Sequence, residues 1–370
     1  GVRHVLEGSV RRADKSVRIT AQLIDVSTDV HLWSKTFDRK IENIFGVQDE
    51  IARAIASALN VELSIAAAER EAPTKNITAY RLFLKARELF RERGDATVLE
   101  SIELYKQAIA IDGGFAEAHA GLAASHTAEG SKHRMKFARH APEATQAARR
   151  AIELNDDLAQ PYAVLGSLAC DRLQWKEAFE KGLAAVTRDP SDSTALLWLG
   201  ITQVAARRIE DATVTLDRAA RVDPLYPFID IWRMRVAFAR RDDAGGAAIA
   251  ERLMRSGPEG AVNGLWFLSY AAKARGDLDA AETHFREAMR TVGAYQELVE
   301  PIVAAIRSPD AVGTATKLIK DAAAEDEDFN PDLLYLLIGD TNAFFELIDD
   351  NLRTGDTTRV VHMLGLAWRL

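Results

Sequence analysis

Residues 160–224, QPYAVLGSLACDRLQWKEAFEKGLAAVTRDPSDSTALLWLGITQVAARRIEDATVTLDRAARVDP, contain one pattern twice. The recurring positions, each 34 residues from its copy, are Leu165-Gly166 and Leu199-Gly200, Ala178 and Ala212, Ala185 and Ala219, and Pro190 and Pro224. A fixed period of this length indicates stacked helical hairpins, because small residues let paired helices approach and a proline ends each unit. The stretch therefore predicts an α-solenoid of antiparallel helix pairs.

The pattern resembles the tetratricopeptide repeat (TPR), which has Leu-Gly, Ala, aromatic-or-Leu and Pro positions. Here these are Leu199-Gly200, Ala212, Leu216 and Pro224. We expect six such repeats in residues 77–294, and degenerate repeats or a helical cap in 295–370. The individual units are expected at 79–112, 116–156, the two copies within 160–224, 227–258 and 262–291. The first is predicted to be lengthened by a loop around Gly94, and the second by extra residues between Gly130 and His140.

Residues 1–65 have a different pattern and predict a small α+β domain. Apolar and polar residues alternate in 17–24, and similar runs at 5–12 and 30–37 are separated by polar turn residues. This arrangement predicts a three-stranded antiparallel meander. A helix with an apolar stripe is expected at about 44–63, and residues 66–76 are predicted to be a linker.

The N-terminal sequence also resembles a known domain. The strings LEGSVRR (6–12), ITAQLID (19–25) and QDEIA (48–52) are similar to the second half of the TolB-like (FlgO-like) domain of bacterial signalling proteins. The resemblance covers residues 1 to about 64. It implies that earlier strands and helices of that domain are missing and that the chain is a fragment. In that family, TPR repeats commonly follow, and a class III adenylate or guanylate cyclase domain or a winged-helix domain commonly precedes.

Composition excludes several classes of protein. The formal net charge of −8 disfavours a general nucleic-acid binder. A single cysteine, Cys170, excludes an internal disulfide, and we expect it to be a small buried residue. No apolar run is long enough to span a membrane. We expect a cytoplasmic location, or a periplasmic one if an upstream segment carries a transmembrane helix.

Histidines and charged runs were weighed as candidate sites. His119, His126, His133 and His140 recur every seven residues, which on one helix places them about 10.5 Å apart, and Gly130-Ser131 is expected to break the helix between them. We therefore predict no metal site there. The basic cluster 132–140, with Arg149 and Arg150, is predicted to be a solvated helix face, and the acidic run 325–328 a solvated loop.

Enzyme motifs are absent from the sequence. It contains no G-x-x-x-x-G-K-[ST], H-E-x-x-H or G-x-S-x-G string. We therefore predict no catalytic residue, cofactor or metal in this chain, and expect any cyclase activity to belong to an upstream domain.

The resemblance to TPR proteins implies that the first helix of each repeat lines a groove. The side chains it places there are Thr194, Leu197, Ile201 and Val204, then Phe228, Ile231, Arg235 and Phe238, then Asn263, Trp266, Tyr270 and Lys273. This largely apolar set suits an apolar or amphipathic partner segment. The alternative is that these side chains pack on neighbouring helices or on the chain's own C-terminal region.

The sequence thus favours a non-catalytic protein-interaction module of a bacterial signalling protein. Two alternatives are the C-terminal regulatory part of a class III cyclase and that of a winged-helix transcriptional regulator. The final helix carries apolar residues on too many sides for one buried stripe, and the first strand leaves an open sheet edge. We therefore expect self-association through one of these ends, most simply as a symmetric dimer.

Overall fold

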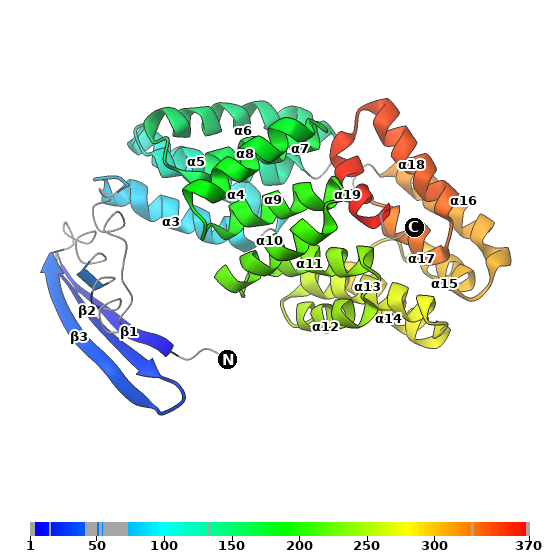
Figure 1. Cartoon of the computed structure of the whole chain (residues 1–370), viewed down its shortest axis with the longest axis horizontal. Helices are drawn as coiled ribbons and strands as arrows, with labels where there is room; N and C mark the ends of the chain where they lie inside the picture. Colours follow the sequence, from blue (N-terminus) through cyan, green and yellow to red (C-terminus); the bar gives the residue numbers. More distant parts are fainter. Residues whose placement is uncertain are drawn as a thin grey trace. The chain divides into compact units, whose positions relative to one another are not determined.

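The computed structural model describes residues 4–14, 16–40, 50–51, 54, 73–92, 94–131, 134–326 and 329–367. The chain divides into two compact units, residues 1–80 and 81–370, and each is described by itself. Figure 1 shows that strands make the first and helices the second. The boundaries predicted from the sequence, at 65 for the N-terminal domain, 76 for the linker and 294 for the repeats, remain predictions.

A three-stranded sheet forms the first unit, as predicted. Its strands β1 (His4–Ala13), β2 (Ser16–Asp25) and β3 (Val30–Lys40) pair antiparallel in that order. The turns contain Asp14 (φ 48°) and Asp29 (φ 54°), in the left-handed region that aspartate tolerates better than most residues.

One face of the sheet is apolar. Val17, Ala21, Leu23 and Phe37 are buried on it, and period-two alternation accounts for their common direction. The opposite face is polar. The predicted helix at 44–63 lies outside the described residues except at 50, 51 and 54.

Six helical hairpins follow, and the helices correspond to the predicted repeats. Their bounds are α3 (Ile77–Glu92), α4 (Asp95–Ile111), α5 (Ala116–Gly130), α6 (Arg134–Leu154), α7 (Ala159–Asp171), α8 (Trp175–Arg188), α9 (Ser193–Ala205), α10 (Ile209–Val222), α11 (Pro227–Ala239), α12 (Asp243–Leu253), α13 (Pro258–Ala274) and α14 (Leu278–Val292). The predicted TPR-type α-solenoid is confirmed.

Small residues hold the hairpins together, as the repeat pattern indicated. A Cβ on Gly166 would lie 3.0 Å from the backbone nitrogen of Gly182, so α7 and α8 touch nearly backbone to backbone. Between the helices of three successive pairs, Leu173, Arg207 and Arg241 have φ near +60°. These three also recur every 34 residues, so the period extends to the backbone of the turns.

The predicted loop around Gly94 is wrong. Helix α3 ends at Glu92 and α4 begins at Asp95, so Gly94 lies in a short connection. The extra residues of this repeat lengthen its helices instead. In the next repeat, α6 likewise runs for 21 residues and includes Pro142.

Within the described residues five further α-helices follow: α15 (Val299–Arg307), α16 (Val312–Glu325), α17 (Asp332–Ile338), α18 (Thr341–Thr354) and α19 (Thr357–Ala367). The chain turns back here. Helix α17 packs against α13, and α19 packs against α6, α7, α9 and α11, where Figure 1 shows its red ribbon beside green α9. No helix in the described ranges has the length and apolarity to span a membrane.

Candidate functional site

The first helices of the last three repeats, α9, α11 and α13, form what we call the first-helix surface. It carries all twelve residues that were predicted to line the groove. Four are buried there, Leu197, Val204, Ile231 and Phe238, and the half-buried ones are Thr194, Ile201, Phe228, Arg235, Asn263, Trp266, Tyr270 and Lys273. None of the twelve is fully exposed, because helices from the end of the chain lie on much of this surface.

Helix α19 lies against α9 at very short range. A Cβ on Gly365 would come within 2.9 Å of Val204 Cγ1, so only glycine permits this approach. Val361 is buried in a cluster with Ala205, and Ile201 packs at its edge. The groove positions of α9 are therefore in contact with the chain's own last helix.

Arg235 on α11 is the polar centre of this contact. Its Nη1 donates a hydrogen bond of 3.2 Å to the main-chain oxygen of His362, and its guanidinium stacks 4.7 Å from the Trp232 ring. Burial lowers the pKa of Arg235, and the carboxylate of Asp332 opposes that effect. Burial likewise raises the pKa of Asp332, whose Oδ2 has no hydrogen-bond partner among the described residues.

His362 itself is neutral in this environment. Its ring lies edge-on to Trp232, with 5.5 Å between the ring centroids. Burial, and secondly the nearby charge of Arg235, lowers the pKa of His362 to about 3. The space beneath α19 thus holds the positive charge of Arg235 and disfavours a second positive charge on His362.

Helix α17 covers the neighbouring part of the surface, on α13. Lys273 Nζ donates a 2.6 Å hydrogen bond to the main-chain oxygen of Leu337, and burial lowers the Lys273 pKa. Tyr270 stacks on Phe238 at 4.7 Å, and Trp266 meets the edge of Phe285 at 5.5 Å.

The structure therefore shows the contacts that the alternative interpretation described, with the C-terminal helices on the predicted groove. Partner binding at these positions stays a prediction. The expectation that the final helix leaves its apolar surface uncovered is wrong, since Val360, Val361 and Leu366 are at most 2% exposed. Trp368 and Leu370 lie outside the described residues.

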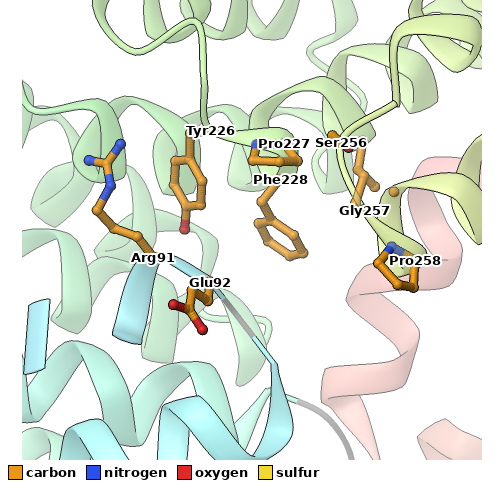
Figure 2. A pocket seen from close by; sticks show the side chains of 10 residues that line it. Arg91, Glu92, Tyr226, Pro227, Phe228, Ser256, Gly257 and Pro258 are labelled. Atoms are coloured by element: carbon orange, nitrogen blue, oxygen red, sulfur yellow. The ribbon is translucent and has the colours of Figure 1, made fainter. Parts of the chain in front are cut away.

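One part of the first-helix surface is open. A pocket of about 130 Å³ lies between the end of α3 and the beginnings of α11 and α13. Figure 2 shows the rings of Tyr226 and Phe228 side by side, with Glu92 facing them. At its rim, Arg91 Nη2 lies 2.6 Å from the Asp223 carboxylate, and the Arg91 guanidinium lies 5.7 Å from the Tyr226 ring.

Phe228 and Ile231 were predicted to line the groove and also line this pocket, whereas Arg91, Glu92 and Tyr226 were not predicted. Arg91 and Asp223 are 132 residues apart, so no local pattern connects them. The contact depends on how far the solenoid turns between its first and fourth repeats. A pairing of Arg91 with Asp223 across related sequences is the signal that could have revealed it.

The histidine spacing was misread in one respect. His126 on α5 and His140 on α6 lie on antiparallel helices, and their Nδ1 atoms are 2.9 Å apart. The expected break after Gly130 is present, and because the chain reverses there the separation of about 10.5 Å on one helix does not apply to this pair. Burial, then the nearby His140, lowers the pKa of His126 to about 4. His119 contacts the Gly113 carbonyl instead, and His133 lies outside the described residues.

Other candidate chemistry is weak in the described part of the chain. No group of three histidine, cysteine or acidic side chains there could hold a metal ion. Cys170 is buried, as predicted, and burial raises the pKa of its thiol. Arg149 and Arg150 are exposed, consistent with a solvated helix face.

Sequence comparison finds one informative relative. A curated protein of Rhizobium meliloti (strain 1021), named putative adenylate cyclase 3, is 42% identical over 124 residues. Those residues are 33% of this chain, which spans only 21% of the length of that protein. No protein-family model matches the chain. The similarity of residues 1–64 to TolB-like domains stays a prediction.

Structure comparison agrees with the fold described above. The APC/C hetero-tetramer Cut9–Hcn1 is similar with a TM-score of 0.51 and 16% identity, over 78% of this chain and 52% of that chain. A tetratricopeptide repeat protein from Parabacteroides merdae ATCC 43184 has a TM-score of 0.44 and 12% identity, over 71% and 98% of the two chains. At these identities the likeness concerns the fold alone, and that fold is a TPR-type α-solenoid.

Proposed function

We propose that this chain is a non-catalytic protein-interaction module of a bacterial signalling protein. The observation that carries the proposal is the first-helix surface itself, which already holds a helix in this structure. Arg235, Trp232 and Val204 contact α19 through a main-chain carbonyl, a ring edge and a glycine. A surface that accommodates one apolar helix has the chemistry to accommodate another.

The partner is a protein segment with a large apolar side chain that enters the open pocket. Phe228 and Tyr226 provide aromatic walls there, and a volume of about 130 Å³ suits one such side chain. The Arg91–Asp223 ion pair at the rim provides both signs of charge for polar contacts around it. Apolar centres with polar rims are typical of protein interfaces.

The similarity to a putative adenylate cyclase favours one parent over the other candidates. We propose that the chain is a regulatory part of a class III cyclase-containing protein, and that catalysis belongs to another domain of it. A winged-helix regulator is the alternative parent.

A first test is to incubate the purified chain with ATP. We expect no cyclic AMP, and turnover that survives repurification would contradict the non-catalytic assignment.

The interaction itself is tested by photo-crosslinking in the native bacterium. A benzophenone-bearing phenylalanine at position 228 places the reactive group in the pocket. The same residue at Leu225, which is 87% exposed and does not line the pocket, is the matched control. We expect a protein adduct at 228 that the control lacks, with an apolar helical segment attached. Identical adducts at both positions, or none, would contradict the proposal.

A further inference from the structure

We infer that the first-helix surface is a helix-binding site whose resident ligand is α19, and that a partner helix binds by taking the place of α19. This inference rests on the proposed function and specifies the partner. The required partner is a helix that is apolar on several sides and carries a glycine where it crosses α9. Its features follow from the contacts of α19.

The glycine requirement follows from the contact with α9. Val204 Cγ1 would lie 2.9 Å from a Cβ at position 365, and the Trp232 ring would lie 3.8 Å from it. A Cβ at position 365 would therefore collide with α9, whereas its distance to Trp232 on α11 is an ordinary van der Waals contact. A helix that binds in this place therefore needs its smallest residue at this crossing.

The apolar requirement follows from how completely α19 is surrounded. Val360, Val361, Met363 and Leu366 are each at most 2% exposed. With about 100° of rotation per residue, these four side chains point in different directions around the helix. The neighbouring helices α6, α7, α9 and α11 enclose it accordingly. A helix with a single apolar stripe would place polar groups against one of these walls.

The polar contact does not depend on the sequence of the bound helix. Arg235 donates to the main-chain oxygen of His362, and every helix has such oxygens. A nearby charge is poorly satisfied, since Asp332 Oδ2 is buried without a hydrogen-bond partner among the described residues. Departure of α19 would return water to the Arg235 guanidinium, which favours exchange over a permanent core contact.

The chain is also built so that α19 is able to leave. Exposed Gly355, with φ of +78°, links it to α18 together with Asp356. Only this link has to rotate. The open pocket provides the entry point, because Ile231 lines it and belongs to the same apolar cluster as Met363 and Leu366.

An exchange experiment tests the inference on the folded full chain. A protease site is inserted between Thr354 and Gly355, both exposed, and the protein is cleaved after folding. A fluorescent peptide of residues 357–370 is then added, and its polarisation is followed. We expect the peptide to replace the cleaved segment, and unlabelled peptide to compete. The matched control peptide carries Gly365→Leu and should bind at least tenfold more weakly.

Two results would overturn the inference. One is that the cleaved chain stays folded by circular dichroism while no labelled peptide enters. The other is that cleavage lowers the helicity of the rest of the chain, which would make α19 a permanent part of the core. Neither result touches the proposed function, because crosslinking at position 228 reports on the open pocket and does not require α19 to leave. An adduct at 228 without peptide exchange would place the partner in the pocket alone.

Discussion

Arg235 and Phe228 lie on one helix, α11, and differ in what covers them. They are seven positions apart, which is nearly two turns, so both side chains are on the same face. Arg235 lies beneath α19 and contacts the carbonyl of His362, whereas Phe228 lines an open pocket. The repeat pattern gives both residues the same role. The difference arises from where the C-terminal segment returns to the solenoid.

This difference has a physical consequence. Charges beneath α19 have lost water and depend on each other, so changes there should act on stability and on its pH dependence. Side chains of the open pocket keep access to solvent. Changes there should act mainly on binding. The predictions below test this contrast, beginning with the largest expected effect on the free energy of unfolding.

Arg235→Met should have the largest effect. It removes the larger of the two positive charges, Arg235 and Arg359, that oppose the burial-raised pKa of Asp332, and leaving a buried carboxylate short of counter-charge costs up to about 3–5 kcal/mol. Urea unfolding followed by circular dichroism measures the loss. The double variant Arg235→Met with Asp332→Asn should recover much of the stability, because it removes both charges. An Arg235→Met protein as stable as the wild type would show that water reaches the charged groups beneath α19.

His362 should make stability depend on pH. Its pKa in the folded chain is about 3, below the ordinary value of 6.5, so the unfolded chain takes up the proton first. The stabilisation is full above about pH 6.5 and is lost as the pH falls toward 3. Between pH 7.5 and 4.5 this one group should lower the free energy of unfolding by about 3 kcal/mol.

The variant His362→Gln isolates this effect from other acid titrations. Carboxylates and His126 titrate in both proteins, so the difference between the two pH profiles belongs to His362. We expect a shallower profile for His362→Gln. Superimposable profiles would mean that water reaches position 362, and that α19 is not seated as described.

Trp266→Ala and Phe228→Ala compare a side chain packed inside its own repeat with a side chain of the open pocket. Trp266 packs on Phe285, so its truncation should cost about 2 kcal/mol. Phe228 is half-buried at the pocket, and its truncation should cost about 1 kcal/mol while weakening partner binding at least tenfold. Urea unfolding measures the loss of stability of each variant. The affinity for the partner identified by crosslinking measures the loss of binding. The contrast fails if Trp266→Ala affects binding and leaves stability unchanged.

The repeats were predictable because their causes are local and periodic. Gly166, Ala178 and Ala185 are small where helices touch, and the same requirement returns 34 residues later. A helical region was also expected at 295–370, and the described residues there form α15 to α19. In each case the sequence near a residue determines its structure.

The covering of the first-helix surface was not predictable in this way. Gly365 and Val204 are in contact although 161 positions separate them, and no repeat position indicates it. His126 and His140 came together for a similar reason, because the turn after Gly130 makes their helices antiparallel. Sequence periodicity specifies each helix pair. It does not specify which later segment of the chain packs on the surface that the stacked helix pairs form together.

The sheet offers a second open apolar surface, and the smallest change in stability is expected there. Val10 and Leu6 on β1 lie on the apolar face, opposite Ile19 and Leu23, yet Val10 is 69% exposed. Because the final helix is buried within its own chain, this strand is the remaining basis for the predicted self-association. Val10→Lys should change the free energy of unfolding by no more than about 0.5 kcal/mol, since little is buried, while a charge on an edge strand opposes pairing with a second copy. Light scattering after size exclusion, over a range of concentrations, should show a dimeric mass for the wild type and a monomeric mass for the variant. A wild type that is monomeric throughout, or a variant that still dimerises, would show that β1 is not the contact.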